Sequence, residues 1–256
     1  MAGLTPQAFD DRVAGYADSA CHRSGPSLPL VLEFANVSPE YFVLDVGTGT
    51  GFAAHALAQR GAYVDALDVS RPMLRHTRAA APAPLRAVRA AAGSIPARGG
   101  SYDVVTCRHA LHHFGDPADA IGEMARVLRP GGRVVIADTQ SPDDSWVASE
   151  MHAIETIRDP SHVRNLSAAE FPRYLRAAGL DVAADRECRS PMDFDQWVAR
   201  SGGTPAMADE LWRRMSEPRV AAAFDAHVDA GARRFAWPVR VIAAVRPVYR
   251  LGASST

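Results

Sequence analysis

The sequence contains no lysine, because all 28 basic residues are arginine. A chain without a lysine amine cannot form a Schiff base with pyridoxal phosphate or with a carbonyl substrate. It also lacks the lysine with which a P-loop binds phosphate. Alanine, arginine, glycine and proline are all abundant, so a bias in the coding sequence explains the missing lysine without a functional reason.

Cysteine and long apolar runs are scarce as well. Cys21, Cys107 and Cys188 are far apart, form no CxxC pair and are odd in number, which argues against a disulfide framework and favours a reducing compartment. The first residues contain no apolar segment of signal-peptide length, and no apolar run approaches the ~20 residues of a membrane span. We therefore expect a cytoplasmic protein without a membrane span.

The chain also has no excess of either positive or negative charge. The formal net charge is -1, so no strong field recruits nucleic acid or an anionic membrane, and we expect no nucleic-acid partner. Hydrophobic residues make up 47% of the chain and charged residues 22%, which is ordinary for a globular protein. A chain of 256 residues is long enough for one sizeable α/β domain and short for two, so we expect a single domain over residues 1–256.

Strand-like and helical patterns alternate in the first half of the chain. Strands are expected over 43–46, 63–69, 85–90, 102–108 and 133–137, and helices over 52–59, 70–78 and 116–128, with a turn at Pro130-Gly131-Gly132. This alternation predicts a parallel sheet covered by helices on both faces. Ligands of such sheets bind at the carboxyl ends of the strands, so the loops after the strands should share one crevice.

The pattern changes after Asp138. Helices are expected over 143–158, 167–179 (capped by Ser167), 193–200, 205–216 and 219–230, and strands over 181–187 and 233–245. Pro238 requires an edge position or a bulge in the last strand. The predicted parts are an N-terminal helical cover (1–40), a ligand-binding core (41–140), lid helices with one strand (141–231), and a final strand with a tail (232–256).

A glycine-rich loop follows the first expected strand, in the run Asp45–Gly51 (DVGTGTG). Glycines let the backbone turn sharply and approach a ligand, although a tight turn without a ligand and a dinucleotide site both use them. Asp68 ends the second strand, where a carboxylate can accept hydrogen bonds from a ribose diol or stabilise the next helix through its dipole. The third glycine comes one position too early for GxGxxG, which argues against a nicotinamide oxidoreductase. Asp45 can meet a cationic amino group, which favours an amino-acid-bearing ligand over a pyrophosphate.

The motifs together resemble the class I S-adenosylmethionine (SAM)-dependent methyltransferases. They are similar to the ubiquinone/menaquinone-biosynthesis C-methyltransferase-like (type 11) branch in five places: Asp45–Gly51, Asp103–Phe114, Met124–Gly132, Arg158–Arg164, and the N-terminal pattern Phe9, Tyr16, His22 and Gly25. The resemblance covers about residues 9 to 190 and is weakest beyond them. It implies a Rossmann-like, seven-stranded, mostly parallel sheet with helices on both faces and a helical lid.

The resemblance also implies the cofactor site. Gly47 and Gly49 would line the methionine part of SAM, Asp68 would hold the ribose, and Tyr16 would cover the cofactor. The further cofactor-binding residues it implies are Asp45, Thr48, Val69, Met73, Ala92, Gly93, Ser94 and Arg108, the last through its backbone beside the sulfonium. One position departs from the family pattern, because Ala91 stands where an acidic or amide residue usually accepts a hydrogen bond from the adenine amine. Such a lost bond costs roughly 1 kcal/mol, unless Ser94 or backbone groups replace it.

Three histidines follow the fourth strand on the expected active-site side, namely His109, His112 and His113. A histidine is the natural general base for a phenol, an enol or an activated carbon, although each of these can instead pack or cap the loop. We take His112 as the first catalytic candidate and His109 as the second, with His22 and His162 as weaker ones. No carboxylate or cysteine completes a metal-ligand spacing, so no metal is expected. The four tryptophans, Trp146, Trp197, Trp212 and Trp237, are expected in the core.

The expected function is methyl transfer from SAM to carbon or oxygen of a small-molecule acceptor of quinone, aromatic or secondary-metabolite type. Methyl transfer needs mainly proximity and alignment, so a certain catalytic base is not required. The main alternative is a SAM-binding protein that catalyses another reaction, such as a cyclisation. A nicotinamide-dependent oxidoreductase is the third hypothesis, and a macromolecular acceptor is a further one. The expected oligomeric state is a monomer or a homodimer, and each of these functions is compatible with both.

Overall fold

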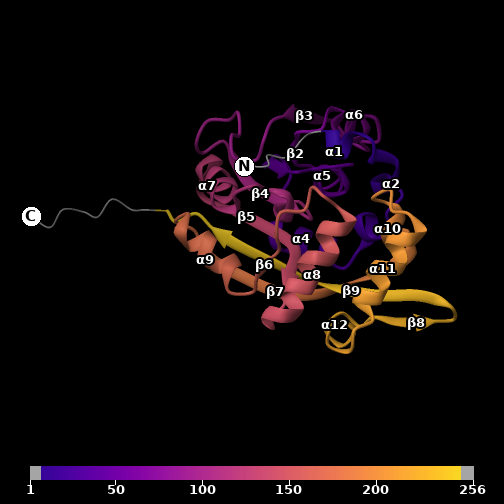
Figure 1. Cartoon of the computed structure of the whole chain (residues 1–256). Coiled ribbons are helices and arrows are strands. Elements are labelled where there is room, and N and C mark those ends of the chain that lie inside the picture. The colour runs from indigo at the N-terminus through magenta and orange to yellow at the C-terminus, as the bar shows by residue number, and fades with distance from the viewer. Residues whose placement is uncertain (1–6, 249–256) are drawn as a thin grey trace, which may run out of the picture.

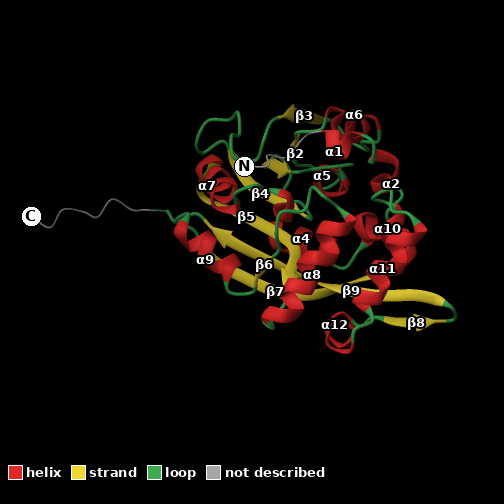
Figure 2. Cartoon of the chain, viewed as in Figure 1, coloured by secondary structure: helices red, strands yellow, loops and turns green. Residues whose placement is uncertain are grey.

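A nine-stranded sheet forms the centre of the computed structural model, which describes residues 7–248 (Figures 1 and 2). Its main path is β3-β2-β1-β4-β5-β9-β7, and the short strands β6 and β8 pair with β5 and β9. The strands are β1 (Phe42–Val46), β2 (Tyr63–Asp68), β3 (Leu85–Arg89), β4 (Tyr102–Arg108), β5 (Leu128–Ser141), β6 (Leu166–Ser167), β7 (Asp181–Asp193), β8 (His227–Asp229) and β9 (Ala232–Val245). The predicted seven-stranded sheet is confirmed as the main path, with two short strands added.

The five strands from β1 to β5 pair in parallel, and β9 inserts antiparallel between β5 and β7. The helices between them are α5 (Phe52–Ala58), α6 (Arg71–Ala79) and α7 (Pro117–Val127), and the 3₁₀ turn η1 (Leu111–His113) follows β4. Ser70 caps α6 by accepting a hydrogen bond from Met73 N, and Asp116 caps α7 by accepting one from Ala118 N. The expected strand–helix alternation is therefore the observed one.

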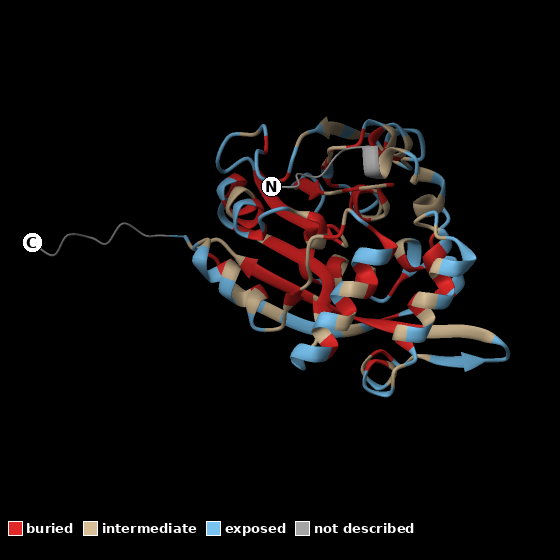
Figure 3. Cartoon of the chain, in the orientation of Figure 1, coloured by how far each residue is buried: buried red, intermediate tan, exposed pale blue. Residues whose placement is uncertain are grey.

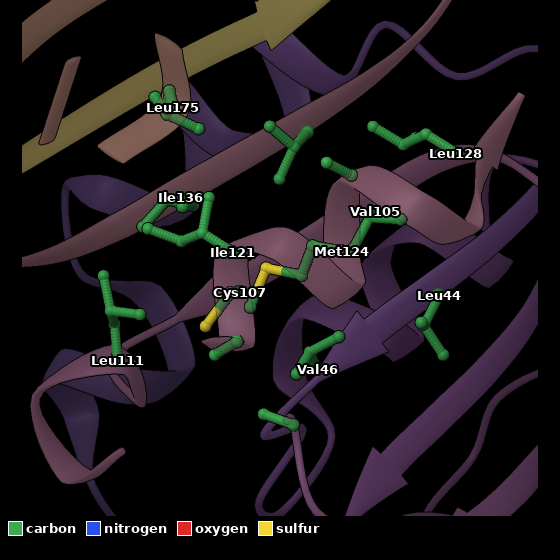
Figure 4. Packing of buried hydrophobic residues seen from close by; sticks show 14 of the residues in the cluster. Leu44, Val46, Val105, Cys107, Leu111, Ile121, Met124, Leu128, Ile136 and Leu175 are labelled. Atoms are coloured by element: carbon green, nitrogen blue, oxygen red, sulfur yellow. The ribbon is translucent and has the colours of Figure 1, made fainter. Parts of the chain in front are cut away.

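Two apolar clusters cover the two faces of the sheet, because successive residues of a strand point to opposite faces. Val105 and Ile136 belong to the cluster that packs against α7, part of which is drawn in Figure 4. Their neighbours Val104 and Val135 belong to the other cluster, which packs against α4 and α5. Both faces are covered, so the central strands are buried, as Figure 3 shows.

Four N-terminal helices precede β1, as the predicted helical cover requires: α1 (Gln7–Asp10), α2 (Val13–Ala17), α3 (Ala20–Ser24) and α4 (Ser27–Ala35). Residues 1–6 of the predicted cover, and residues 249–256 of the predicted tail, lie outside the described part of the chain.

The segment after β5 has an apolar core of its own. Its helices are α8 (Ser145–Arg158), α9 (Glu170–Ala177), α10 (Phe194–Ala199), α11 (Pro205–Met215) and α12 (Pro218–Phe224). Four of them, α8, α10, α11 and α12, pack together with Phe235 and Trp237 of β9, and Figure 1 shows them gathered near the β8 end of β9. The other helix, α9, contributes Phe171 and Leu175 to the cluster around α7.

Several predicted boundaries were wrong. The helix expected over 219–230 ends at Phe224, because Asp225 adopts a left-handed conformation and β8 follows. The segment 141–231 contains three strands, β6, β7 and β8, where the prediction had only one. Ser167 does not cap a helix, since its hydroxyl donates to the Glu170 carboxylate ahead of α9. The turn at 130–132 lies within β5 as an irregularity of the pairing with β4.

The tryptophans and Pro238 follow the sequence prediction in part. Trp197 and Trp237 are buried, Trp212 packs against the same cluster, and Trp146 is 40% exposed, so the prediction of a core position was wrong for Trp146. Pro238 pairs with Arg189 of β7, one residue beyond the point where β5 stops pairing with β9 at Val239. At Pro238, β9 is therefore locally an edge strand. An edge position tolerates proline, which has no N–H to donate to a neighbouring strand. Among residues 7–248, no helix has the length and apolar character needed to cross a membrane.

Candidate functional site

A cavity of about 370 Å³ lies at the carboxyl ends of β1, β2 and β4. The glycine loop after β1 forms one wall, and Asp68, Val69 and Met73 form another. The N-terminal cover contributes Phe9, Tyr16 and His22. This volume lies within the range of small-molecule and cofactor sites, roughly 300–1,000 Å³. The predicted crevice is therefore present where parallel strands end.

The glycine loop needs two of its glycines for different reasons. Gly47 has φ +67°, and a Cβ there would lie 2.5 Å from the Cβ of Ala110. Gly49 has φ +54°, and no heavy atom lies within 4 Å of its hypothetical Cβ, because this position faces the cavity. Thr77 holds the loop from behind by donating its hydroxyl to Gly49 O at 2.7 Å. The loop is thus fixed by α6 and leaves room for a ligand at Gly49.

Asp68 joins the end of β2 to the glycine loop. Its Oδ2 accepts a hydrogen bond from Gly49 N at 2.8 Å, and its Oδ1 accepts one from Ser70 N at 2.9 Å. Burial raises the pKa of this carboxyl, and the two backbone donors lower it again in part. Each oxygen keeps a second lone pair, so the carboxylate can also accept hydrogen bonds from a ligand diol.

Asp45 is buried at the floor of the cavity. Its Oδ1 accepts a hydrogen bond from the Thr106 hydroxyl at 2.6 Å. Burial raises the pKa of the Asp45 carboxyl, and this hydrogen bond opposes the rise. An acid in this position gains from a cationic ligand group, which favours the charged form.

Arg108 ties the N-terminal cover to the end of β4. Its guanidinium donates to Ser27 Oγ at 3.0 Å, to His22 O at 2.7 Å and to Cys21 O at 3.0 Å. The side chain is buried, and burial lowers its pKa to about 10. The next residue, His109, has φ +52°, a strained conformation for a residue with a Cβ. Hydrogen bonds from Arg108 therefore hold the N-terminal cover against the carboxyl end of β4.

Most predicted cofactor residues line this cavity: Tyr16, Asp45, Gly47, Thr48, Gly49, Asp68, Val69, Met73, Ala92 and Arg108. Gly93 and Ser94 do not line it, because the chain turns away after Ala92 and Ser94 N donates to Ala91 O. Phe52 and Phe114 also line the cavity, although no site role was predicted for either. Phe52 directly follows the glycine loop and Phe114 ends the histidine run, and these two positions could have indicated a role in the site.

A second cavity of about 50 Å³ adjoins the first. Tyr16, His22, His109 and His113 line both cavities, so these four side chains form a shared wall. The second cavity continues toward α8, α10 and the strands β7 and β9. His112, the first catalytic candidate, lines the second cavity and not the first, whereas His109 lines both.

His112 forms a buried pair with Asp138 of β5. The Nδ1–H donates to Asp138 Oδ1 at 2.5 Å, and His112 N donates to Oδ2 at 3.2 Å. Burial alone lowers the pKa of this imidazole, but the Asp138 charge outweighs burial and raises the pKa above its ordinary 6.5. The same pair lowers the pKa of the Asp138 carboxyl against the effect of burial. With Nδ1 protonated, Nε2 is the free basic nitrogen.

The other histidines differ from His112. Burial lowers the pKa of His109 and of His113 to about 3, and it lowers that of His22 well below 6.5. His109 Nε2 lies 3.1 Å from Ser27 Oγ, and His113 Nδ1 lies 3.1 Å from Ser161 O. These rings are neutral near pH 7 and weakly basic, so they form walls of the site more readily than they accept protons.

The segment Arg158–Arg164 holds the histidine run in place. Val163 N and Arg164 N both donate to His112 O, and the Asp159 carboxylate pairs with Arg12 at 2.7 Å. Ser161 donates its hydroxyl to Asp159 at 2.6 Å. The motif therefore connects the lid, the cover and the site. His162 lies in this segment and lines neither cavity.

No group of three or more histidine, cysteine, aspartate or glutamate side chains within residues 7–248 is arranged to hold a metal ion. The site instead has the construction of a nucleotide-cofactor pocket: a glycine loop after β1, an acid after β2, and an open crevice where the parallel strands end. With β9 antiparallel between β5 and β7, this construction agrees with the class I methyltransferase type that the sequence motifs resemble.

Comparison with known proteins identifies the family. A family model for a methyltransferase domain matches residues 44–136. The uncharacterized methyltransferase YcgJ of Bacillus subtilis is 32% identical over 210 residues, which are 80% of this chain and 82% of that protein. The crystal structure of YcgJ matches with a TM-score of 0.80 at 26% identity and covers 87% of this chain and 99% of that chain.

Two relatives with named activities match shorter parts of the chain. The demethylmenaquinone methyltransferase of Clavibacter sepedonicus is 38% identical over 62% of this chain and 64% of its own length. The ubiquinone biosynthesis O-methyltransferase of Idiomarina loihiensis is 33% identical over 56% of this chain and 62% of its own length. The chain belongs to the SAM-dependent methyltransferases.

SAM is the cofactor of this family, and the described residues fit it. Thr48 Oγ1 is buried beside the cavity without a hydrogen-bond partner among residues 7–248, so a polar ligand group can satisfy it. The open space at Gly49 can hold the methionine part of SAM, which a side chain at this position would displace. Leu67, Val69 and Met73 offer an apolar wall for a base, next to the Asp68 carboxylate for a ribose.

Proposed function

We propose that the protein transfers a methyl group from SAM to a small-molecule acceptor, with SAM in the larger cavity and the acceptor entering the smaller one. The observation that carries the proposal is the wall shared by the two cavities, formed by Tyr16, His22, His109 and His113. These four side chains border both cavities, so a donor in one and an acceptor in the other meet where the two cavities adjoin, and such positioning can supply about 7–11 kcal/mol of the barrier.

The residues around SAM have separate roles in this proposal. Asp68 binds the ribose hydroxyls, Thr48 and the backbone at Gly47 and Gly49 bind the methionine part, and Asp45 faces its ammonium group. Val69, Met73 and Ala92 contact the adenine, and Tyr16 and the Arg108 backbone border the sulfonium. Gly93 and Ser94 have no contact with the cavity and take no part.

When bound, SAM would supply the methyl group from its positively charged sulfur, which would keep the S–CH₃ bonding electrons as the leaving group. The protein's part is to hold the acceptor and remove its proton. His112 Nε2 accepts this proton, and Asp138 fixes the ring and stabilises the imidazolium that results. His109 stays a neutral wall residue in this scheme, because its pKa is about 3.

The named relatives support small-molecule chemistry, since they are methyltransferases of quinone biosynthesis. The second cavity, of about 50 Å³, fits a small acceptor group better than a macromolecular chain. A cyclisation that uses SAM without consuming it is the alternative of a different class.

The deciding experiment has two stages. Calorimetric titration of the purified protein with SAM, S-adenosylhomocysteine and NADH should show micromolar binding of the two sulfur ligands and none of NADH. Incubation with SAM and a panel of phenols, quinols and aromatic acids should then release S-adenosylhomocysteine and add one methyl mass to an acceptor. A changed acceptor without S-adenosylhomocysteine release would favour cyclisation, and absence of SAM binding would refute the proposal.

A further inference from the structure

The smaller cavity contains polar groups that the described protein leaves unsatisfied. Ser190 Oγ, Trp237 Nε1 and Arg200 Nε are buried atoms without a hydrogen-bond partner among residues 7–248. All three residues line this cavity, and Ser190 and Trp237 are each 2% exposed. A buried polar group without a partner costs free energy, so a ligand that supplies partners to these atoms binds more tightly.

The fold brings these three groups together from distant segments. Ser190 of β7 and Trp237 of β9 are directly opposite each other in the antiparallel register, so their side chains lie on the same face of the sheet. Arg200 stands at the end of α10, on the lid side of the same cavity. One strand pair and one helix end therefore build this group of atoms.

The unsatisfied atoms are mostly donors. An indole N–H and a guanidinium N–H can only donate, and a serine hydroxyl can do both. The charges near them differ as well. Arg158 lies 3.7 Å from the Glu155 carboxylate and stacks on Trp197, whereas Arg200 is in no ion pair with the described residues and touches Met192 Sδ at 3.9 Å. The cavity thus offers donors and one uncompensated positive charge.

We propose that Arg200, Trp237 and Ser190 bind an oxyanion of the acceptor, a carboxylate or a phenolate, and so select a small anionic aromatic or enolic acceptor over a neutral one. This inference rests on the proposed methyltransferase function. A cavity of about 50 Å³ holds a few non-hydrogen atoms. It therefore receives the oxyanion group, while the rest of the acceptor lies toward His109, His112 and the shared wall.

The same arrangement explains why the lid has its own core. Trp197 and Trp237 pack in the cluster formed by α8, α10, α11 and α12, and both also line the cavity. Their rings hold the polar groups in fixed positions and add an apolar surface for a planar acceptor. Two of the three polar residues, Arg200 and Trp237, lie beyond residue 190, where the resemblance to known methyltransferases is weakest.

The test uses the full chain saturated with S-adenosylhomocysteine and three probes of similar shape: benzoate, 4-nitrophenolate and neutral benzamide. Calorimetry should show at least tenfold tighter binding of one or both anions than of benzamide, and the stronger of the two identifies the oxyanion type. Equal binding of all three probes would mean that water satisfies the three groups, and it would overturn the inference.

Variants locate the effect. Arg200→Gln should weaken anion binding about tenfold to a hundredfold, because it removes a charge-assisted hydrogen bond. Trp237→Phe, which keeps an aromatic ring and loses only the N–H, should weaken it less. Arg213→Gln, on the exposed side of α11, is the matched control and should change nothing. Unchanged anion binding in Arg200→Gln would also overturn the inference.

The cofactor serves as the internal reference. Arg200 does not line the larger cavity, so S-adenosylhomocysteine should bind Arg200→Gln within about twofold of its wild-type affinity, which also shows that the variant is folded. If the wild-type protein binds no S-adenosylhomocysteine, the proposed function fails. If it binds S-adenosylhomocysteine but does not discriminate benzoate from benzamide, only the oxyanion inference fails.

Discussion

His112 Nδ1 lies 2.5 Å from Asp138 Oδ1, and the His112 side of this pair lines the smaller cavity. Asp138 also accepts a hydrogen bond from Thr139 N at 2.7 Å, so its orientation is fixed by the strand β5. A carboxylate held in this way fixes the tautomer of the imidazole and leaves Nε2 free to accept a proton. The pair therefore distinguishes His112 from the four neighbouring histidines, which have no carboxylate partner of this kind among residues 7–248.

The first prediction concerns pH. His112 must be neutral to accept a proton, so the rate of methyl transfer should rise as pH rises through its pKa, which lies above 6.5. Asp138→Asn removes the charge that raises this pKa and leaves the burial that lowers it. The rising limb should then move to lower pH, and the plateau should fall about tenfold to a hundredfold because the base is weaker and its ring less well oriented.

Two measurements check this prediction. Ring-proton chemical shifts followed by NMR give the pKa of His112 in the wild-type protein and in Asp138→Asn without any acceptor. The pH–rate profile of His112→Gln should lack the limb altogether, while its affinity for S-adenosylhomocysteine stays unchanged. A limb that persists in His112→Gln would assign the titration to another group.

The second prediction concerns Asp68. Asp68→Ala should weaken SAM binding by about 1.5–3 kcal/mol, which is a factor of ten to over a hundred, because charge-assisted hydrogen bonds to the ribose are lost. The change also removes the acceptor of Gly49 N and thus loosens the glycine loop. Asp65→Ala is the matched control, since Asp65 lies on the same strand and pairs with Arg86 and Tyr102 away from the cavity. Wild-type SAM affinity in a folded Asp68→Ala protein would remove the ribose assignment.

The third prediction is a gain of affinity at Ala91. This residue is exposed and lines the larger cavity, at the position where the resemblance to the methyltransferase family implies an acid or amide. Ala91→Asp should therefore add an acceptor for the adenine amine without burying a charge, and it should tighten SAM binding about fivefold, or ~1 kcal/mol. Ala91→Leu adds a side chain without an acceptor. Equal affinities of these two variants would show that the adenine lies elsewhere.

Sequence reasoning predicted the part of the site that is built from one local segment. The loop Asp45–Gly51 and Asp68 could be placed because a glycine pattern and a strand end each specify a backbone conformation. The His112–Asp138 pair was not predicted, since it joins a turn after β4 to the end of β5 through a side-chain contact. The group formed by Ser190, Trp237 and Arg200 could not be predicted either. Its Ser190–Trp237 pair depends on the antiparallel register of β7 and β9, which the sequence does not specify locally.

The fold errors have a comparable cause. The helix expected over 219–230 was extended across Asp225, where alanine-rich sequence continues but the backbone turns left-handed and starts a hairpin. Trp146 was expected in the core by its size, yet it lies on the exposed side of α8, where Arg219 stacks on its ring. Local propensity does not report which face of a lid helix the remainder of the chain covers.

The last prediction concerns stability in acid. His162 is 6% exposed, neither ring nitrogen has a hydrogen-bond partner among residues 7–248, and burial lowers its pKa to about 3. Because the folded-state pKa lies below the unfolded value of ~6.5, the unfolded chain binds the proton first. The free energy of unfolding is therefore unaffected by this group above pH ~6.5, and it falls by up to about 1.4 kcal/mol per pH unit as pH decreases toward 3.

His109 and His113 have the same lowered pKa and add to this slope. His162→Leu removes one titrating ring and two unsatisfied nitrogens, so the loss of unfolding free energy between pH 7 and pH 5.5 should shrink by about 1 kcal/mol. His227→Leu makes the same substitution at an exposed position of β8, away from the buried histidines, and is the control. Urea denaturation of the three proteins at both pH values measures the difference. A slope that is the same in His162→Leu as in the wild type would mean that the ring takes up its proton in the folded protein, and that the packing around α8 opens enough to admit water.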